Sequence, residues 1–551
     1  MKKCNVLLVS PAFPLNTFWN LKATSKVAGA RHPAIPLGLL TVAAMLPPEW
    51  TCRLIDCNVT DLADSDLDWA DLVMTGGMNV QRAHCMEVIE RAQRRGKPVA
   101  VGGPDVSSEP HDYAAADFVV TGEAEHIIEK FIEAWNSGLR RGTFNAERFS
   151  VDVTQTPAPR FDLVRRSDYL FYSLQFSRGC PFNCEFCDII ELYGRRPRVK
   201  TVEQFMGEIE TLYRTGYRGH LDFVDDNFIG NKKAVKALLP VLSDWQKRHG
   251  YPFWFSTEAS LNLADDDDLL AAMRAANFAI VFVGIESPDT TTLVSMRKKQ
   301  NTRRSIAASV HKIYAAGMLV IAGFIIGFDT EGASVSEEMI RCIEEAALPI
   351  SIVGLLVALP NTQLARRLRQ EGRLYPSAWL MANAKEQGGD QCTLGLNFET
   401  RRPQREVLVD YKRVIDTIYS PAAFFERAVG VARRLGNWPA HGGAQTPPRW
   451  VFLGFTNSDW MGLFRLLVSA ARTNRATFIQ VVRTLIWTLR NAPQAMHAVS
   501  IYAAFYLHLG PFSRWVSASI ARRIDQIDRN EWHSPLPEKE EVARQPIETA
   551  A

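Results

Sequence analysis

Short apolar runs alternate with longer amphipathic segments through residues 1–135. Each run has four or five residues, rich in β-branched or aliphatic side chains, which is typical of strands buried in a parallel sheet. The alternation predicts an α/β fold with a doubly wound, Rossmann-like sheet. The five predicted strands are Val6–Val9, Cys52–Asp56, Leu72–Thr75, Val99–Gly102 and Phe118–Thr121.

The same alternation resumes between residues 171 and 365, after a polar, proline-bearing stretch (136–170) that we interpret as a linker. Six strand–helix units in succession indicate a second parallel sheet, curled into a barrel. In such sheets functional groups gather at the carboxyl ends of the strands. The predicted strands are Ser173–Ser177, His220–Val224, Phe253–Thr257, Ala279–Ile285, Leu319–Ile326 and Ile350–Ala358.

After about residue 365 the alternation stops and the pattern becomes mostly helical. A stretch rich in Gly and Pro separates two helical regions. The charged, proline-bearing end of the chain has the composition of a disordered tail. The predicted segments are a helical extension of the barrel (366–436), a linker (437–448), a basic aromatic helical region (449–530) and the tail (531–551).

Composition and charge narrow the class of protein. The chain has 551 residues and a formal net charge of only +3, which argues against a nucleic-acid binder. It contains no run of 18 or more apolar residues and no signal-peptide pattern, so no spanning helix is expected. The nine cysteines form no disulfide framework, and we expect a cytoplasmic protein.

The charge is unevenly distributed. Residues 401–529 contain 18 Lys and Arg against 7 Asp and Glu, a net charge of +11, so the rest of the chain carries −8. Basic helices with aromatic faces can lie on an anionic membrane surface. The alternative, which we favour, is a helical cap over the barrel with its arginines in water. A cap of this kind can also contact a membrane, so the protein could be peripheral at the inner membrane.

Three cysteines occur at the spacing CxxxCxxC, directly after the first predicted barrel strand. They are Cys180, Cys184 and Cys187, and the other six cysteines are scattered singly. Thiolates are the ligands of [4Fe–4S] clusters, and three of them leave one iron open to a small molecule. A structural zinc site normally needs four ligands in paired knuckles, and no second CxxC or HxxxH lies nearby.

This motif after an apolar strand resembles that of the radical S-adenosylmethionine (SAM) enzymes, and the six units resemble their partial (β/α)6 barrel. The resemblance implies that the open iron chelates SAM, whose cleavage gives a 5′-deoxyadenosyl radical. Polar residues and glycines at successive strand ends would then bind SAM. These candidates are Asp225, Asp226, Asn227, Glu258, Ser260, Glu286, Ser287, Gly323 and Gly327. Each could instead be an ordinary helix cap or turn residue.

The strand ends of the first sheet carry glycines and hydroxyls, which allow a large ligand to approach the backbone. No GxGxxG loop is present, so NAD is not expected. Gly-Gly-Pro and Gly-Glu-x-Glu ahead of a radical SAM barrel resemble the cobalamin-binding domain of the B12-dependent class, over roughly residues 5–135. The implied cobalamin-binding residues are Ser10, Gly76, Gly77, Asn79, Gly102, Gly103, Ser107, Thr121, Gly122 and Glu123.

One motif of some cobalamin domains is missing. The sequence Asp-x-His-x-x-Gly, which supplies a histidine to cobalt, does not occur in this segment. We therefore expect a corrinoid held without histidine ligation. The loop after the first strand contains Phe13, Leu15, Phe18 and Trp19, which could shield a face of the cobalt or belong to the core.

The domain order resembles that of hopanoid C-2 methylases, bacteriochlorophyll side-chain methylases and the anaerobic cyclase of bacteriochlorophyll synthesis. It implies a C-methyltransferase that acts on an unactivated carbon of a small, apolar isoprenoid or tetrapyrrole. An electron donor such as flavodoxin or ferredoxin would be a partner. An oxidative cyclase or rearrangement enzyme with the same cofactors remains an alternative, as does a cobalamin- or redox-responsive sensor. The sequence does not indicate the oligomeric state.

Overall fold

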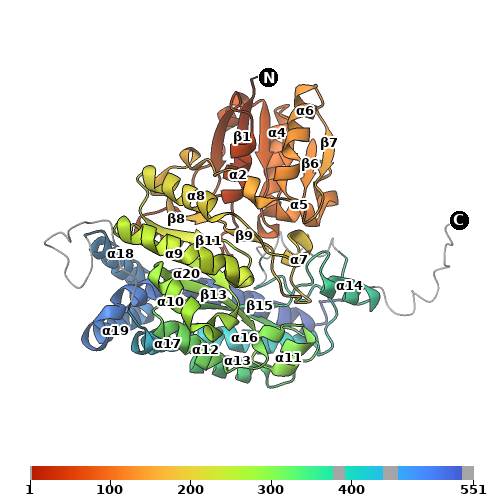
Figure 1. The fold of residues 1–551 in the computed structure, drawn as a ribbon. Helices are drawn as coiled ribbons and strands as arrows, with labels where there is room; N and C mark the ends of the chain where they lie inside the picture. Colours follow the sequence, from red (N-terminus) through yellow and green to blue (C-terminus); the bar gives the residue numbers. More distant parts are fainter. Residues whose placement is uncertain (1–2, 377–389, 391, 438–456, 537–551) are drawn as a thin grey trace.

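The structure, a computed structural model, describes residues 3–376, 390, 392–437 and 457–536. An N-terminal α/β domain stands above a larger α/β barrel, and helices of the C-terminal third cover the lower part of the barrel (Figure 1). Most of the predicted linker 437–448 and of the predicted tail 531–551 lies outside the described residues.

The N-terminal domain contains a six-stranded parallel sheet in the order β3-β1-β4-β5-β6-β7. Its strands are β1 (Asn5–Ser10), β3 (Thr51–Asp56), β4 (Leu72–Thr75), β5 (Val99–Val101), β6 (Phe118–Thr121) and β7 (Gly142–Asn145). The helices of this region are α1 (Lys22–Ala28), α2 (Leu37–Met45), α3 (Asp64–Trp69), α4 (Arg82–Arg94), α5 (Pro104–Ser108) and α6 (Ile128–Asn136).

Both faces of this sheet are covered, as the apolar runs predicted. Successive side chains of a strand point to opposite faces, so Leu7 and Val9 pack in one cluster with α3 and α4. Val6 and Leu8 pack in a second cluster with α2 and α6. The predicted doubly wound sheet is therefore confirmed.

The barrel sheet has seven parallel strands in the order β15-β14-β13-β12-β11-β8-β2. Six match the predicted units: β8 (Tyr169–Leu174), β11 (Gly219–Phe223), β12 (Phe253–Ala259), β13 (Phe278–Glu286), β14 (Leu319–Ile326) and β15 (Ser351–Leu355). The helices around them are α7 (Ile189–Leu192), α8 (Val202–Arg214), α9 (Lys232–Arg248), α10 (Asp267–Ala275), α11 (Thr290–Ser295), α12 (Ile306–Ala315), α13 (Val335–Glu345) and α14 (Gln363–Gln370).

Two short strands differ from the predicted organisation. The seventh barrel strand, β2 (His32–Ala34), comes from the N-terminal region and pairs with β8. Strand β7 lies inside the stretch 136–170, which was expected to be a linker, and extends the first sheet beyond β6. One strand of the N-terminal region thus belongs to the barrel sheet, so the two α/β units are joined by β2 as well as by the chain between them.

The two faces of the barrel sheet differ in exposure. On the outer face, residues such as Val281 and Val320 are completely buried beneath the helices. On the inner face, Phe282 and Ile321, which are paired in register, are only partly buried. The interior of the half-barrel is therefore less filled than a closed (β/α)8 barrel, whose side chains pack the centre.

The C-terminal helices share one hydrophobic core with the barrel. Tyr506 donates a hydrogen bond to the carbonyl oxygen of Tyr419 (2.9 Å), and Thr24 of α1 donates one to the carbonyl oxygen of Ala504 (3.1 Å). Among the described residues, none of the helices combines the length and the hydrophobicity that a membrane span needs. These helices are α16 (Gln404–Ile418), α17 (Pro421–Arg434), α18 (Asn457–Thr473), α19 (Arg475–Asn491) and α20 (Met496–Asp528).

Candidate functional site

The three cysteines lie on a tight loop between β9 (Ser177–Arg178) and α7. Gly179 begins this loop with φ +96°, a left-handed conformation that favours glycine. A Cβ atom there would meet the carbonyl oxygens of Gly194 and Arg196 at 3.0 and 3.1 Å. The antiparallel pairing of β9 with β10 (Arg198–Val199) closes the loop. The sequence therefore folds Cys180, Cys184 and Cys187 into one compact turn.

Amide groups point at two of the sulfur atoms. The Nδ2 atom of Asn227 lies 3.9 Å from Cys180 Sγ, and the Nε2 atom of Gln300 lies 3.9 Å from Cys184 Sγ. Burial raises the pKa of all three thiols, so they depend on a bound metal to become thiolates. Amide donors to sulfur stabilise thiolate charge, and this donor set fits a [4Fe–4S] cluster.

The described residues contain no three histidine, cysteine or acidic side chains that converge to hold one metal ion. This finding is compatible with a cluster, because each cysteine of a [4Fe–4S] site ligates a different iron. The three sulfur atoms therefore need to surround the cluster and not to meet at one point.

Asp225 and Asp226, expected at a SAM site, brace the cysteine loop. Asp225 is completely buried and accepts hydrogen bonds from the backbone N–H groups of Phe176 (3.0 Å) and Ser177 (2.5 Å). Asp226 accepts one from Gly179 N–H (2.7 Å) and remains partly accessible. Burial raises the pKa of Asp225 to about 7 and that of Asp226 to about 6. Of this pair, only Asp226 has access to a ligand.

Asn227, Glu258 and Ser260 come together at the ends of β11 and β12, as expected. The amide oxygen of Asn227 accepts a hydrogen bond from the Ser260 N–H group at 3.2 Å. Glu258 is accessible to water inside the barrel. Its surroundings are nevertheless poorly solvated, and burial first, then the charge of Asp222, raises its pKa from 4.5 to about 8.

Glu286 ends β13 and Ser287 follows it, but they do not present two free oxygens. Glu286 adopts φ +67°, rare for a non-glycine residue, and forms a buried ion pair with Lys298. Ser287 is completely buried and accepts a hydrogen bond from Asp289 N–H (3.2 Å). Lys298 was missed by the sequence analysis, because only the fold brings it beside Glu286 and the cysteine loop.

The two glycines of β14 have different surroundings. A Cβ atom at Gly323 would point at the inner face, 3.1 Å from the ring of Phe282 and 3.8 Å from the Oε2 atom of Glu286. Gly327 turns away toward Leu396 and donates its N–H to the Oε2 atom of Glu331 (2.8 Å). Gly323 therefore belongs to the interior of the barrel, whereas Gly327 packs against its C-terminal extension.

A polar chain runs deeper inside the barrel and was also missed. His220 Nε2 lies 2.6 Å from Ser256 Oγ, which donates to the carboxylate of Asp222. Trp254 stacks on His220, with ring centroids 3.8 Å apart. The alternating positions 220 and 222, and 254 and 256, place these side chains on the inner face. That alternation is the sequence signal by which they could have been found.

At the carboxyl end of the first sheet, the backbones of two loops touch. A Cβ atom at Gly76 would lie 1.9 Å from the carbonyl oxygen of Gly102, and one at Gly103 (φ +101°) would lie 3.6 Å from Gly77 N. A larger residue at Gly76 would collide with the neighbouring loop. The four glycines thus form a smooth cradle at the strand ends, which fits a large planar ligand such as a corrin ring.

The other residues expected to bind cobalamin have varied environments. Ser107 accepts a hydrogen bond from Gly122 N–H (2.8 Å) and joins two of the loops. Thr121 donates to Asn145 Oδ1 at 2.7 Å, Asn79 is exposed and Ser10 is buried. These positions surround the cradle, although only some of their polar atoms remain available to a ligand.

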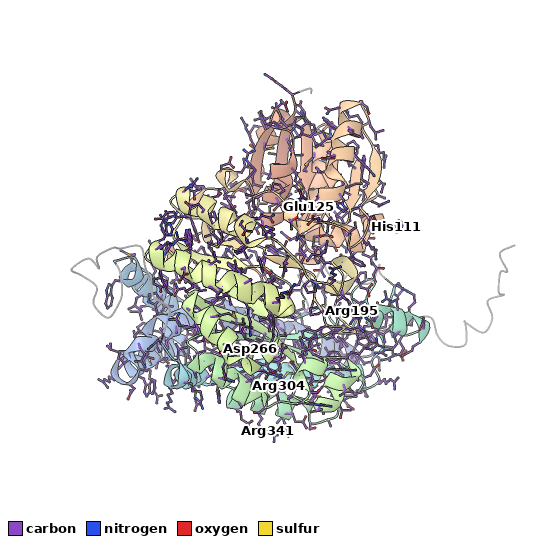
Figure 2. All side chains as sticks on the ribbon, in the orientation of Figure 1. His111, Glu125, Arg195, Asp266, Arg304 and Arg341 are labelled. Atoms are coloured by element: carbon purple, nitrogen blue, oxygen red, sulfur yellow. The ribbon has the colours of Figure 1, made fainter. Side chains whose placement is uncertain are left out.

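Glu123 is engaged by the barrel instead of being open to a ligand. Its carboxylate pairs with Arg178 (3.0 Å) and Arg198 (2.7 Å), and Arg178 also pairs with Glu125 (2.6 Å). All four side chains are at most 13% exposed. Figure 2 labels Glu125 at the junction of the two units. Because Arg178 immediately precedes Gly179, this network attaches the first sheet to the cysteine loop.

The loop after β1 projects apolar side chains beyond the strand ends. Leu15 is 77% exposed and Trp19 is 37% exposed, whereas Phe18 is buried with its N–H bonded to Asp390 (2.7 Å). Nearby, His84 Nδ1 accepts a hydrogen bond from the N–H group of Ala12 at 3.0 Å. The Nε2 atom of a neutral His84 therefore carries the proton and is a donor.

Three family models match consecutive segments of the chain. The B12 binding domain matches residues 26–132, the radical SAM superfamily matches 174–343, and a domain of unknown function (DUF4070) matches 362–522. Fold and site together define a radical SAM enzyme with a cobalamin domain. Its cofactors are a [4Fe–4S] cluster, SAM and cobalamin.

Similar proteins identify the family within this class. A Synechocystis protein described as an uncharacterized methyltransferase is 43% identical over 432 residues, which cover 78% of this chain and 79% of that protein. Hopanoid C-2 methylase of Rhodopseudomonas palustris is 39% identical over 396 residues (71% and 72%). The chain belongs to the cobalamin-dependent radical SAM methyltransferase family that includes these two proteins.

A solved structure agrees on the fold. The cobalamin-dependent SAM radical enzyme OxsB with aqua-cobalamin bound superposes with a TM-score of 0.57, at 14% identity, over 97% of this chain and 82% of that one. At this level of identity the likeness shows the fold alone.

Proposed function

We propose that the protein transfers a methyl group to an unactivated carbon of a small, largely apolar molecule. When bound, the cluster and SAM supply a radical that removes hydrogen from carbon, and cobalamin supplies the methyl group. The observation that carries the proposal is the buried network of Arg178, Glu123 and Glu125. This network joins the domain of the glycine cradle to the cysteine loop. A substrate that reacts with both cofactors has to lie at such a junction.

In this proposal Cys180, Cys184 and Cys187 hold the cluster. The residues around them fix the loop and supply charge for binding SAM. Asp225 fixes the start of the loop through its backbone hydrogen bonds. The Lys298 ammonium, buried near Cys184, offers a positive charge to an anionic group such as a carboxylate.

The remaining strand-end residues on the inner face form the proposed SAM pocket. Asp226, Asn227, Glu258 and Ser260 provide carboxylate, amide and hydroxyl groups for the ammonium and ribose of SAM. The accessible carboxylates of Asp226 and Glu258 would lie near its positive charges, and such a ligand would draw both pKa values down.

The cradle of Gly76, Gly77, Gly102 and Gly103 is the proposed seat of the corrin ring. Leu15 and Trp19 project from the neighbouring loop and would keep water from one face of it. Because His84 Nδ1 is occupied as an acceptor, its Nε2 atom has no lone pair to offer to cobalt.

Two observations support an apolar substrate. The inner face of the barrel carries Phe282, Ile321 and Ile325 as partly buried side chains. One relative of the family is named for methylation of a hopanoid. Apolar walls with a few polar groups are typical of small-molecule pockets. The chain His220–Ser256–Asp222 would then be the polar end of the pocket.

Helices α18 and α19 provide a surface on which an apolar substrate could be collected. Phe464 is 63% exposed, and Met461, Ile479, Ile486 and Leu489 are also exposed. Arginines interleave with these side chains along both helices. Apolar side chains flanked by cations suit the surface of an anionic bilayer, so we include peripheral membrane contact in the proposal.

The proposal is tested in a strain that lacks the gene, complemented with wild type or with Cys184→Ala. We expect one lipid or pigment compound to gain the mass of a methylene only with the wild type, measured by mass spectrometry. Cys342→Ala, far from the loop, is the matched control and should also restore the compound. A product that differs from its precursor by a ring or an oxidation level would instead support a cyclase.

Purified Cys184→Ala should lose the visible absorbance of the cluster and the formation of 5′-deoxyadenosine. It should retain cobalamin, because the cradle lies on the other sheet. Turnover by this variant would contradict the proposed role of the cysteine.

A further inference from the structure

The inner face of the half-barrel is divided into a polar side and an apolar side. Strands β11 and β12 present His220, Asp222 and Ser256, because residues paired in register share a face of the sheet. Glu258, one position further along β12, is exposed, so the interior between the two sides is open to water. The opposite side, on β13, β14 and β15, consists of Ile280, Phe282, Ile321, Ile325 and Ile352.

The polar side is one hydrogen-bonded chain, and its direction follows from counting hydrogen atoms. Ser256 Oγ donates its single hydrogen to the Asp222 carboxylate. The contact of 2.6 Å between Ser256 Oγ and His220 Nε2 therefore requires the histidine to donate. Burial lowers the pKa of His220 to about 3, so the ring is neutral and its Nδ1 atom keeps a lone pair. Both ends of the chain are thus hydrogen-bond acceptors.

The carboxyl groups on this side have no cationic partner. Among the described residues, neither Asp222 nor Glu258 forms an ion pair with a lysine or an arginine. The buried carboxylates of Glu208 and Glu286 differ, because each pairs with a lysine. Burial raises the pKa of Asp222, and an approaching hydrogen-bond donor would lower it again. The polar side therefore attracts donors and repels anions.

Aromatic rings hold the chain in place. Trp254 stacks on His220, with ring centroids 3.8 Å apart and an angle of 4° between the planes. Phe171 of β8 lies against the same imidazole, with centroids 4.8 Å apart. The acceptors are fixed before a ligand arrives, so little conformational freedom is lost when one binds.

The chain lies deep below the proposed SAM pocket. Asp222 and Ser256 each come four residues before a residue of that pocket, Asp226 and Ser260 respectively. A strand rises about 3.3 Å per residue, so the depth is about 13 Å. A group bound at this depth is remote from the carbon that reacts beside SAM. It can orient an elongated molecule without taking part in the chemistry.

We propose that His220, Asp222 and Ser256 recognise one hydrogen-bond donor of the substrate, a hydroxyl or an amino group, at the end remote from the methylated carbon. The inference rests on the proposed function, because the substrate of that reaction has to enter the half-barrel. Acceptors beside uncompensated carboxyls bind a donor and reject a carboxylate or a phosphate. The apolar side accommodates the rest of the molecule. These residues therefore determine specificity and are not catalytic.

Three probes with one carbon skeleton test which group is recognised. They are geraniol, geranylamine and geranic acid, which differ only in the polar group at one end. Isothermal titration calorimetry measures the Kd of each for the holoenzyme with cluster, SAM and cobalamin, without a reductant. We expect the alcohol and the amine to bind at least tenfold more tightly than the acid. The tighter of the two shows whether the recognised donor is a hydroxyl or an amino group.

Asp222→Asn keeps the size of the side chain and removes its charge. We expect the preference for the alcohol over the acid to fall at least tenfold in this variant. Asp268→Asn is the matched control, because this aspartate of α10 is exposed, and it should keep the wild-type preference.

His220→Phe is a second variant, which serves if Asp222→Asn folds poorly. It keeps an aromatic ring against Trp254 and removes the nitrogen acceptor. We expect it to weaken binding of the alcohol at least several-fold and to leave the Kd of the acid unchanged. Its Tm and its Kd for SAM should equal those of the wild type.

Equal affinities of the wild type for the three probes would overturn the proposal, as would binding of neither the alcohol nor the amine. An unchanged preference in Asp222→Asn would also overturn it. None of these titrations requires methyl transfer. An enzyme that methylates a compound but shows no preference among the probes refutes this inference alone. An enzyme that has the preference but methylates nothing refutes the proposed function alone.

Discussion

Glu258 is an acid whose proton affinity is changed by its position in the barrel. Its pKa of about 8 in the folded protein compares with 4.5 for an ordinary glutamate, and burial is the main cause. The folded state therefore holds a proton that the unfolded chain releases, and the wild type loses stability as the pH rises from 4.5 through about 8.

We predict that Glu258→Gln raises Tm at pH 9 and that the difference from wild type shrinks below pH 5. Differential scanning calorimetry of the protein without SAM measures both. The control Glu203→Gln changes an exposed glutamate of α8. It should have the same Tm as the wild type at each of the two pH values. A Tm of Glu258→Gln below that of wild type at pH 9 would show that the carboxylate is stabilising.

His84 tests whether the corrinoid has a protein ligand. Its Nδ1 atom accepts the Ala12 N–H, so the proton resides on Nε2 and no lone pair is free for cobalt. We predict that the electron paramagnetic resonance spectrum of bound cob(II)alamin lacks splitting from an axial nitrogen. The spectrum should be the same for His84→Ala, and a splitting that this variant removes would contradict the prediction.

At the scale of single residues, the sequence indicated the chemistry of the site best where one short motif contains all the protein ligands. The spacing of Cys180, Cys184 and Cys187 indicated the cluster, because its ligands lie within eight residues. Asp225 illustrates the limit, since its oxygens are used by backbone N–H groups nearly fifty residues away. Lys298 could not be predicted, because its pairing with Glu286 depends on how a loop folds back.

Among the structural elements, the junction between β6 and β9 carries a cluster of buried charge. Arg178 neutralises Glu123 and Glu125, and all three are at most 13% exposed. We predict that Arg178→Met destabilises the protein by ~3–5 kcal/mol, because it leaves the buried carboxylate of Glu125 without a cationic partner, whereas Glu123 keeps its pair with Arg198. Denaturant unfolding followed by circular dichroism measures the loss.

The double variant Arg178→Met/Glu125→Gln separates charge from packing. It removes the uncompensated carboxylate and leaves the pair of Glu123 with Arg198 intact, so most of the lost stability should return. Equal stabilities of the single and double variants would show that the network stabilises through packing alone.

The strands that the sequence predicted are those with apolar runs, and they form the two parallel sheets. Strands β2 and β7 were missed because their sequences, His-Pro-Ala and Gly-Thr-Phe-Asn, contain no apolar run. Strand β2 also contains Pro33, which cannot donate to a ladder and is tolerated at a sheet edge. Their pairings are decided by distant parts of the chain, which no local pattern reveals.

For the molecule as a whole, the unequal distribution of charge gives a prediction about membranes. Phe464→Ser/Ile486→Ser removes two exposed apolar side chains from α18 and α19. We expect it to reduce binding to vesicles of anionic lipid at least several-fold in a sedimentation assay, because each side chain contributes about 1.5–3 kcal/mol when buried.

Val294→Ser, an exposed apolar residue of α11, is the control and should bind like wild type. Binding should also fall as salt increases, since the arginines contribute through charge. Wild type that stays in the supernatant with every vesicle would favour the interpretation of the helices as a cap in water.

The origin of β2 limits how such a protein can be rearranged. This strand leaves the N-terminal unit between β1 and α2, completes the edge of the barrel beside β8, and returns. A recombination event that joined another cobalamin unit to this barrel near residue 135 would also replace a strand of the barrel itself. The two units are therefore consecutive in the sequence but share a sheet in space, so replacing one of them alone would also change the edge of the barrel.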